Sequence, residues 1–135
     1  MENLLQEDIV GSIGTKKYYC KIQWSNGTFI MDEPKDIEGN DEGPDPYSTL
    51  LASLAGCTLS TLRMYIDRKG WLIPEITVKL NMYQEKQPDL VTYIKREISF
   101  SSEVSEEQKI KLLTIAGKCP VSKILENKVE IKSSI

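Results

Sequence analysis

The 135-residue chain has the length of one compact domain or of one subunit in a small oligomer. Its 17 basic and 20 acidic side chains give a formal net charge of −3, and without a basic stripe this argues against a nucleic-acid partner. No stretch approaches the ~20 apolar residues of a membrane span, and the acidic start lacks the basic end of a signal peptide. The absence of histidine excludes Ser-His-Asp triads, Cys-His pairs and His-ligated zinc.

The only cysteines are Cys20, Cys57 and Cys119, which form neither a CxxC motif nor an even disulfide framework. With no secretory signal we expect a reducing, cytoplasmic location, where a cysteine pair that bonds does so transiently, as catalyst or sensor. These three side chains therefore become the candidates for any redox chemistry.

The N-terminal part predicts a β-hairpin followed by an acidic loop. Residues 18–24 alternate in polarity, an Asn26-Gly27 turn signal follows, and residues 28–31 form the returning strand. Cys20 falls on the apolar side of the first strand, where a small buried side chain is the expected role. Residues 32–45 are acidic and rich in Gly and Pro, which favours a solvated loop over a calcium site because the EF-hand spacing is absent.

A long helix is predicted from Pro46 to about Lys69, with Asp45 as its N-cap and Gly70 just beyond its end. Apolar residues cover most of its circumference, so one chain of this size cannot cover it on all sides. We therefore expect a homo-oligomer that buries the helix between subunits.

The remaining elements place this chain in the α+β class, as a single domain over residues 1–135. In order, the pattern predicts an antiparallel hairpin from residues 76–83 and 90–100, a helix opened by a capping box at 105–108, a short helix from 119 to 125 and a last strand at 129–133.

The local surroundings of two cysteines differ. Cys57 lies deep in the apolar helix with hydroxyl groups such as Ser60 at helical spacing, and burial alone raises the pKa of such a thiol. Cys119 precedes Pro120 and is expected at the N-cap of the short helix, where free N–H groups stabilise a thiolate. Each cysteine could instead be purely structural, and local sequence leaves that alternative open.

Several motifs resemble the OsmC/Ohr family of osmotically inducible and organic hydroperoxide resistance proteins. They are DEP at 32–34, GPDPYSTLLASLAGCT at 43–58, TLRMY at 61–65, RKGW at 68–71 and GKCPVSKIL at 117–125. The resemblance implies curved antiparallel sheets around long central helices in an intertwined homodimer. It also implies a cysteine peroxidase in which Cys57 is peroxidatic and Cys119 resolving, with a dithiol reductant, of lipoyl type in the family, and with no cofactor or metal.

The sequence departs from this family at the groups that activate the reactive cysteine. Active members use an arginine from the N-terminal hairpin region and a glutamate at the start of the central helix. Here Tyr47 and Ser48 occupy the first helical turn, and no arginine lies in the N-terminal region. Lys16 or Lys17 is the candidate cation, and Glu42 or Asp45 is the candidate carboxylate. Ser122 stands where many relatives carry histidine.

Two functional hypotheses follow from the resemblance and these departures. The leading one is thiol-dependent reduction of organic hydroperoxides by Cys57 and Cys119. The alternative is a catalytically weak or inactive dimer that binds a small hydrophobic ligand. A third possibility is a structural member of the fold with no small-molecule role.

Overall fold

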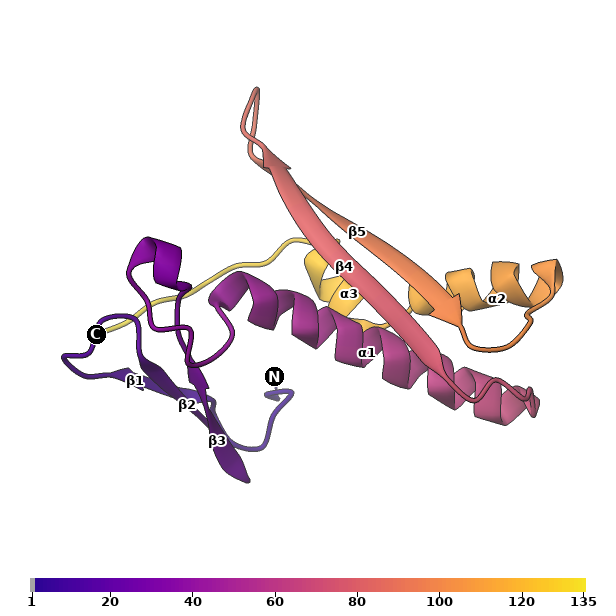
Figure 1. Ribbon diagram of the computed structural model, residues 1–135, viewed down its shortest axis with the longest axis horizontal. Helices are drawn as coiled ribbons and strands as arrows, with labels where there is room; N and C mark the ends of the chain where they lie inside the picture. Colours follow the sequence, from indigo (N-terminus) through magenta and orange to yellow (C-terminus); the bar gives the residue numbers. More distant parts are fainter. Residues whose placement is uncertain (1) are drawn as a thin grey trace. The chain divides into compact units, whose positions relative to one another are not determined.

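A computed structural model describes residues 2–135, which fall into two compact units, one ending at Leu50 and the other beginning at Leu51. The two units are described separately, and the prediction of a single domain over residues 1–135 stays a prediction. Strands and helices are segregated along the chain, which confirms the α+β class (Figure 1).

The first unit contains a three-stranded antiparallel sheet in the order β1-β2-β3, formed by β1 (Val10–Ile13), β2 (Cys20–Trp24) and β3 (Gly27–Met31). The β2–β3 hairpin was predicted, but its turn lies one residue earlier than expected, because Trp24 pairs with Gly27. A Cβ at Gly27 would approach the Trp24 ring to 2.7 Å, so glycine at this position leaves room for the ring. Strand β1 was not predicted, since its four residues are exposed and show no alternation.

The acidic loop of this unit is held by one buried carboxylate. Asp32 accepts hydrogen bonds from the backbone N–H groups of Glu33 at 2.8 Å and Glu42 at 3.2 Å. A short 3-10 helix, η1 (Lys35–Ile37), lies within the same loop. The loop ends at Asp45, whose side chain accepts the N–H of Ser48 at 3.1 Å and caps the next helix as predicted.

Helix α1 (Pro46–Lys69) has the predicted bounds, and Gly70 follows it with a left-handed φ of 69°. By length and composition alone α1 passes for a membrane span, contrary to the expectation from sequence. Fully buried Leu62 and Ile66 nevertheless make it the central helix of the second unit's core.

The second unit places a long hairpin, β4 (Ile76–Glu85) and β5 (Val91–Phe100), across α1, as Figure 1 shows. The pairing matches the prediction, and alternate residues of both strands are the less exposed ones. Helices α2 (Glu106–Ala116) and α3 (Pro120–Leu125) complete the unit. The predicted capping box is present at Ser105 and Gln108.

The core of the second unit joins α1 to α2 and to the segment that follows α1. Its buried members are Leu62, Ile66, Ile73, Leu112 and Ala116. The strand expected at residues 129–133 is not formed, because this segment has no paired strand among residues 2–135 and its Ile131 is exposed.

Truncation of a core leucine tests this packing. Leu62 is fully buried, so Leu62→Ala should lower the free energy of unfolding by about 2–5 kcal/mol in urea titrations. Leu72, which is 92% exposed, is the matched control, and Leu72→Ala should change stability by less than about 0.5 kcal/mol. Equal losses for the two variants would contradict this account of the core.

Candidate functional site

Cys57 lies in the middle of α1 and is half-buried. Its Sγ accepts a hydrogen bond from the backbone N–H of Val121 at 3.5 Å, which ties the centre of α1 to the first turn of α3. The hydroxyl of Thr61, one helical turn further on, is a second hydrogen-bond partner of this thiol. Cys57 is therefore a positioned thiol with part of its surface open.

Cys119 is the N-cap residue of α3, with Pro120 in the first turn, as the sequence predicted. Its Sγ accepts the backbone N–H of Ser122 at 3.4 Å and the Ser122 hydroxyl at 3.5 Å. The side chain is fully buried. The sulfur thus replaces the oxygen that usually caps a helix, and it is enclosed by donors.

The structure brings Cys57 and Cys119 together, although 61 residues separate them in the sequence. Both are free thiols, and each is near enough to shift the pKa of the other. Two consecutive N–H groups of α3 hold the pair, that of Val121 on Cys57 and that of Ser122 on Cys119. The sulfurs are therefore neighbours in a fixed arrangement.

Arg96 is the cation next to this pair. It lies on β5 opposite Leu80, on the less exposed face of the strand. Its Nη1 donates to the hydroxyl of Ser122 at 2.8 Å and to that of Thr58 at 3.0 Å. The guanidinium thus reaches Cys119 through one intervening hydroxyl.

The direction of these hydrogen bonds follows from the chemistry of the groups. Arginine only donates, so the Ser122 and Thr58 oxygens accept from Arg96 and keep their own hydrogens for other acceptors. Thr58 gives its hydrogen to the carbonyl of Leu54 at 2.7 Å, and Ser122 gives its hydrogen to the sulfur of Cys119. A chain of polarised donors therefore runs from Arg96 through Ser122 to Cys119.

The two thiols have opposite pKa shifts. Burial raises the pKa of the Cys57 thiol, and its hydrogen bond with Cys119 raises it further, against the opposing effect of the Val121 N–H. Burial also acts to raise the pKa of Cys119, but hydrogen bonds from Cys57 and Ser122 outweigh it and the pKa is lowered. In the pair, Cys119 is thus the thiol that ionises first and Cys57 the one that keeps its proton.

Two hollows lie near the cysteines, although neither Cys57 nor Cys119 is among their lining residues. One of about 260 Å³ includes Thr61, the hydroxyl partner of Cys57, and Pro120. Its other lining residues are Met64, Tyr65, Arg68, Ile115 and Lys118. The other hollow, of about 340 Å³, includes Arg96 and Ser122 together with Glu126 and four aliphatic side chains.

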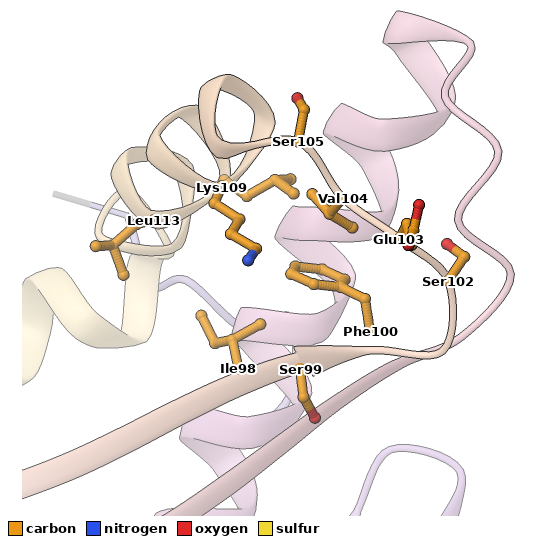
Figure 2. Close-up of a pocket in the computed structure, with 10 residues that line it drawn as sticks. Ile98, Ser99, Phe100, Ser102, Glu103, Val104, Ser105, Lys109 and Leu113 are labelled. Atoms are coloured by element: carbon orange, nitrogen blue, oxygen red, sulfur yellow. The ribbon is translucent and has the colours of Figure 1, made fainter.

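A larger groove of about 850 Å³ lies between the end of β5 and α2 and includes neither cysteine. Figure 2 shows Phe100, Val104 and Lys109 extending into this space above Ile98. It is lined by five apolar side chains, three serines, Glu103 and Lys109. This groove is therefore distinct from the cysteine pair.

The supporting residues predicted from sequence lie on α1 and in the first unit. Ser60 is exposed on α1, and Tyr47 and Ser48 form its first turn, well before Cys57 along the helix. Lys17 belongs to the first unit, where it forms an ion pair with Glu38. Their roles stay predictions.

Sequence reasoning missed Arg96, Thr58 and the bonding of Ser122. A signal for Arg96 was present, because the alternation of the predicted strand places it in phase with the apolar Ile94 and Ile98. An arginine on the inward face of a half-buried strand needs hydrogen-bond partners, which identifies it as a candidate for the site.

Comparison with known proteins identifies the family to which this chain belongs. A family profile described as OsmC-like protein matches residues 39–134. This chain therefore belongs to the OsmC family. A search of curated protein sequences finds no match.

Solved structures share the fold at low sequence identity. The OsmC-like protein of Mycoplasma pneumoniae has a TM-score of 0.71 at 20% identity, covering 93% of this chain and 89% of that one. The organic hydroperoxide resistance protein of Elizabethkingia anophelis, with thiocyanate bound, has a TM-score of 0.70 at 21% identity, covering 96% and 94%. OhrB of Bacillus subtilis has a TM-score of 0.66 at 18% identity, covering 96% and 97%.

The opposite pKa shifts predict a titration that depends on both thiols. Because the pKa of Cys119 is lowered, its thiolate persists to lower pH than that of an ordinary thiol, whose pKa is about 8.5. Absorbance at 240 nm should follow this ionisation. Cys57→Ala removes one hydrogen-bond donor and should raise the pKa of Cys119. Cys20→Ser, in the other unit, is the control and should leave the low-pH ionisation in place; a Cys57→Ala titration identical to wild type would contradict the assignment.

Proposed function

We propose that this protein reduces organic hydroperoxides, with Cys57 as the thiol that reacts with the peroxide and Cys119 as the thiol that resolves the product. The observation that carries this proposal is the pair of thiols held by consecutive N–H groups of α3, in which Cys57 is partly open and Cys119 is fully buried. A peroxide can approach only the open sulfur, and the buried one is already adjacent. Such a pair suits sequential oxidation and disulfide formation.

The cycle has three steps. The Cys57 sulfur attacks the terminal oxygen of the hydroperoxide, the O–O bond breaks, and an alcohol leaves while Cys57 becomes a sulfenic acid. The Cys119 sulfur then attacks the Cys57 sulfur, forming the S–S bond and releasing water. A dithiol reductant finally restores both thiols by exchange, becoming a disulfide itself.

The hollow near Cys57 supports a substrate with an apolar part. Met64, Tyr65 and Ile115 line it, and burial of an alkyl chain there contributes about 25 cal/mol per Å². Two neighbours in fold bind small molecules: thiocyanate in the Elizabethkingia protein, and captopril in one of the active sites of a Vibrio cholerae organic hydroperoxide resistance protein. By likeness to these, we expect organic hydroperoxides as substrates, and a dithiol of lipoyl type in the reducing cytoplasm as the reductant.

Counting thiols after peroxide treatment tests the proposal. Reduced wild-type protein given one equivalent of cumene hydroperoxide should lose two of its three free thiols, because one disulfide forms. Cys57→Ser should form no intramolecular disulfide, and Cys20→Ser, the matched control, should still lose two thiols. Retention of all three thiols in wild type would overturn the proposal.

A homodimer belongs to the same proposal. The chain buries few apolar side chains for its size, and several large ones are exposed on the second unit, among them Met64, Leu113 and Ile131. Contact with a second copy would remove such surface from water. These exposed side chains thus support the same homo-oligomer that the apolar circumference of α1 led us to expect.

Light scattering after size exclusion tests the assembly. We expect a mass twice the 15.3 kDa of the chain at micromolar concentration, because exposed apolar surface of this extent favours association. The same mass across a tenfold dilution would show that the dimer is stable. A single-chain mass throughout would contradict the proposed assembly.

The alternative, a catalytically inactive protein that binds a small hydrophobic ligand, is favoured by the 850 Å³ groove beside α2. It becomes the better account if wild type keeps its thiols and native mass spectrometry finds a ligand retained on the chain.

A further inference from the structure

We propose that Cys119, as a thiolate held by Ser122 and Arg96, is the base that accepts the proton of Cys57 when the peroxide is attacked. This inference rests on the proposed function and adds to it a second role for Cys119, before its role as the resolving thiol. It also assigns Arg96 as a positioning residue that acts through Ser122.

The need for a base follows from the state of Cys57. Burial keeps this thiol protonated near neutral pH, whereas the nucleophile must be the thiolate. The chain has no histidine, and the start of α1 carries no carboxylate in its first turn. The proton must therefore pass to a group beside the sulfur.

Only one neighbour of Cys57 can take that proton. Within residues 51–135, the Val121 N–H donates to its sulfur at 3.5 Å, and the Thr61 hydroxyl and the Cys119 thiol are near enough to shift its pKa. An amide N–H and an alcohol are not bases at neutral pH, whereas a thiolate is. Charged groups in the two hollows, namely Arg68 and Lys118 in one and Arg96 and Glu126 in the other, form no hydrogen bond with Cys57 among these residues.

The surroundings of Cys119 are suited to a thiolate. Its sulfur accepts from the N–H of Ser122 at 3.4 Å and from the hydroxyl of Ser122 at 3.5 Å. That hydroxyl is polarised by Arg96 at 2.8 Å, and Arg96 is fixed by its second bond, to Thr58. The cation thus stabilises the anion without contacting it, and the sulfur stays adjacent to Cys57.

In the peroxide step, protons and electrons balance between the hydroperoxide and the Cys57–Cys119 pair. As Cys57 attacks, its S–H proton moves to the Cys119 sulfur, and the electron pair of the breaking O–O bond leaves on the alkoxide. The alkoxide takes the proton back from Cys119, giving the alcohol, the Cys57 sulfenic acid and the Cys119 thiolate. That thiolate then attacks Cys57, the S–S bond forms, and hydroxide leaves with the negative charge and is neutralised by the buffer.

The first experiment measures the peroxide step apart from the resolving step, in a Cys20→Ser background. Release of cumyl alcohol from one equivalent of cumene hydroperoxide is followed in a single turnover at pH 7, with and without Cys119→Ser, because the alcohol leaves in the peroxide step. General-base catalysis gives about 10²–10⁴-fold, so the rate of alcohol release should fall at least about tenfold in Cys119→Ser. A thiol that only resolves would leave the rate unchanged or, by removing a neighbouring negative charge, raise it. Either of these results overturns the proposal while leaving the proposed function intact.

The second experiment tests Arg96 by a pH profile. In Arg96→Leu the pKa of Cys119, followed at 240 nm without peroxide, should rise by about 1, because a nearby cation is lost. The midpoint of the rate-against-pH curve should move by the same amount, and Arg96→Lys should restore part of it. Lys95→Leu, on the opposite face of the same strand, is the matched control and should leave both midpoints unchanged.

Circular dichroism establishes that each variant folds. If Arg96→Leu titrates like Lys95→Leu, the role of Arg96 is overturned. If wild type releases no cumyl alcohol, the proposed function and this inference fall together. If wild type reacts and Cys119→Ser reacts equally fast, only the inference is overturned.

Discussion

The site depends on one geometric constraint, which is that two consecutive backbone N–H groups each reach a different sulfur. Val121 donates to Cys57 on α1, and Ser122 donates to Cys119 at the cap of α3. Free N–H groups occur only in the first turn of a helix, so α3 must begin where it does for both bonds to form. Pro120 in that turn, which lacks an N–H and fits the helical φ, helps to fix this start.

Arg96 shows what this arrangement costs and how the cost is offset. A guanidinium on the less exposed face of a hairpin loses hydration, which is unfavourable unless hydrogen bonds replace it. Two hydroxyls, from Thr58 on α1 and Ser122 on α3, provide those bonds. The arginine therefore links three elements of the second unit, and its placement is set by the β4–β5 register rather than by local sequence.

Features decided by local rules were predictable from the sequence. The bounds of α1, the capping box at Ser105, the cap at Cys119 and the long hairpin follow from capping preferences and from hydrophobic periodicity. Features that depend on a partner in space were not. The strand expected at 129–133 has the right alternation but no paired strand among residues 2–135, and β1 pairs with β2 without any alternation of its own.

The same distinction applies to the site. Cys57 and Cys119 were found through motifs, whereas Arg96 was considered only for its absence from the N-terminal region. The alternation of the strand predicts that Arg96 points inward. Its hydrogen-bond partners, however, lie on α1 and α3, and only the tertiary structure brings these elements together. The roles suggested for Tyr47, Ser48 and Lys17 assumed that activation comes from the N-terminal region. Those roles stay predictions, and the structure adds Arg96 of β5 as a cation that reaches Cys119 through the Ser122 hydroxyl.

The ionisation order of the two thiols reverses what burial alone would give. Desolvation penalises a charged group more strongly the less exposed it is, so the fully buried Cys119 should be the harder thiol to ionise. Its pKa is nevertheless the lower, because donors surround its sulfur, while the more open Cys57 has fewer of them. Hydrogen bonding therefore assigns the two properties to different residues: the Cys57 sulfur is the more exposed one, and the Cys119 thiol is the one with the lowered pKa. In a chain without histidine, this separation gives two identical side chains different chemical properties.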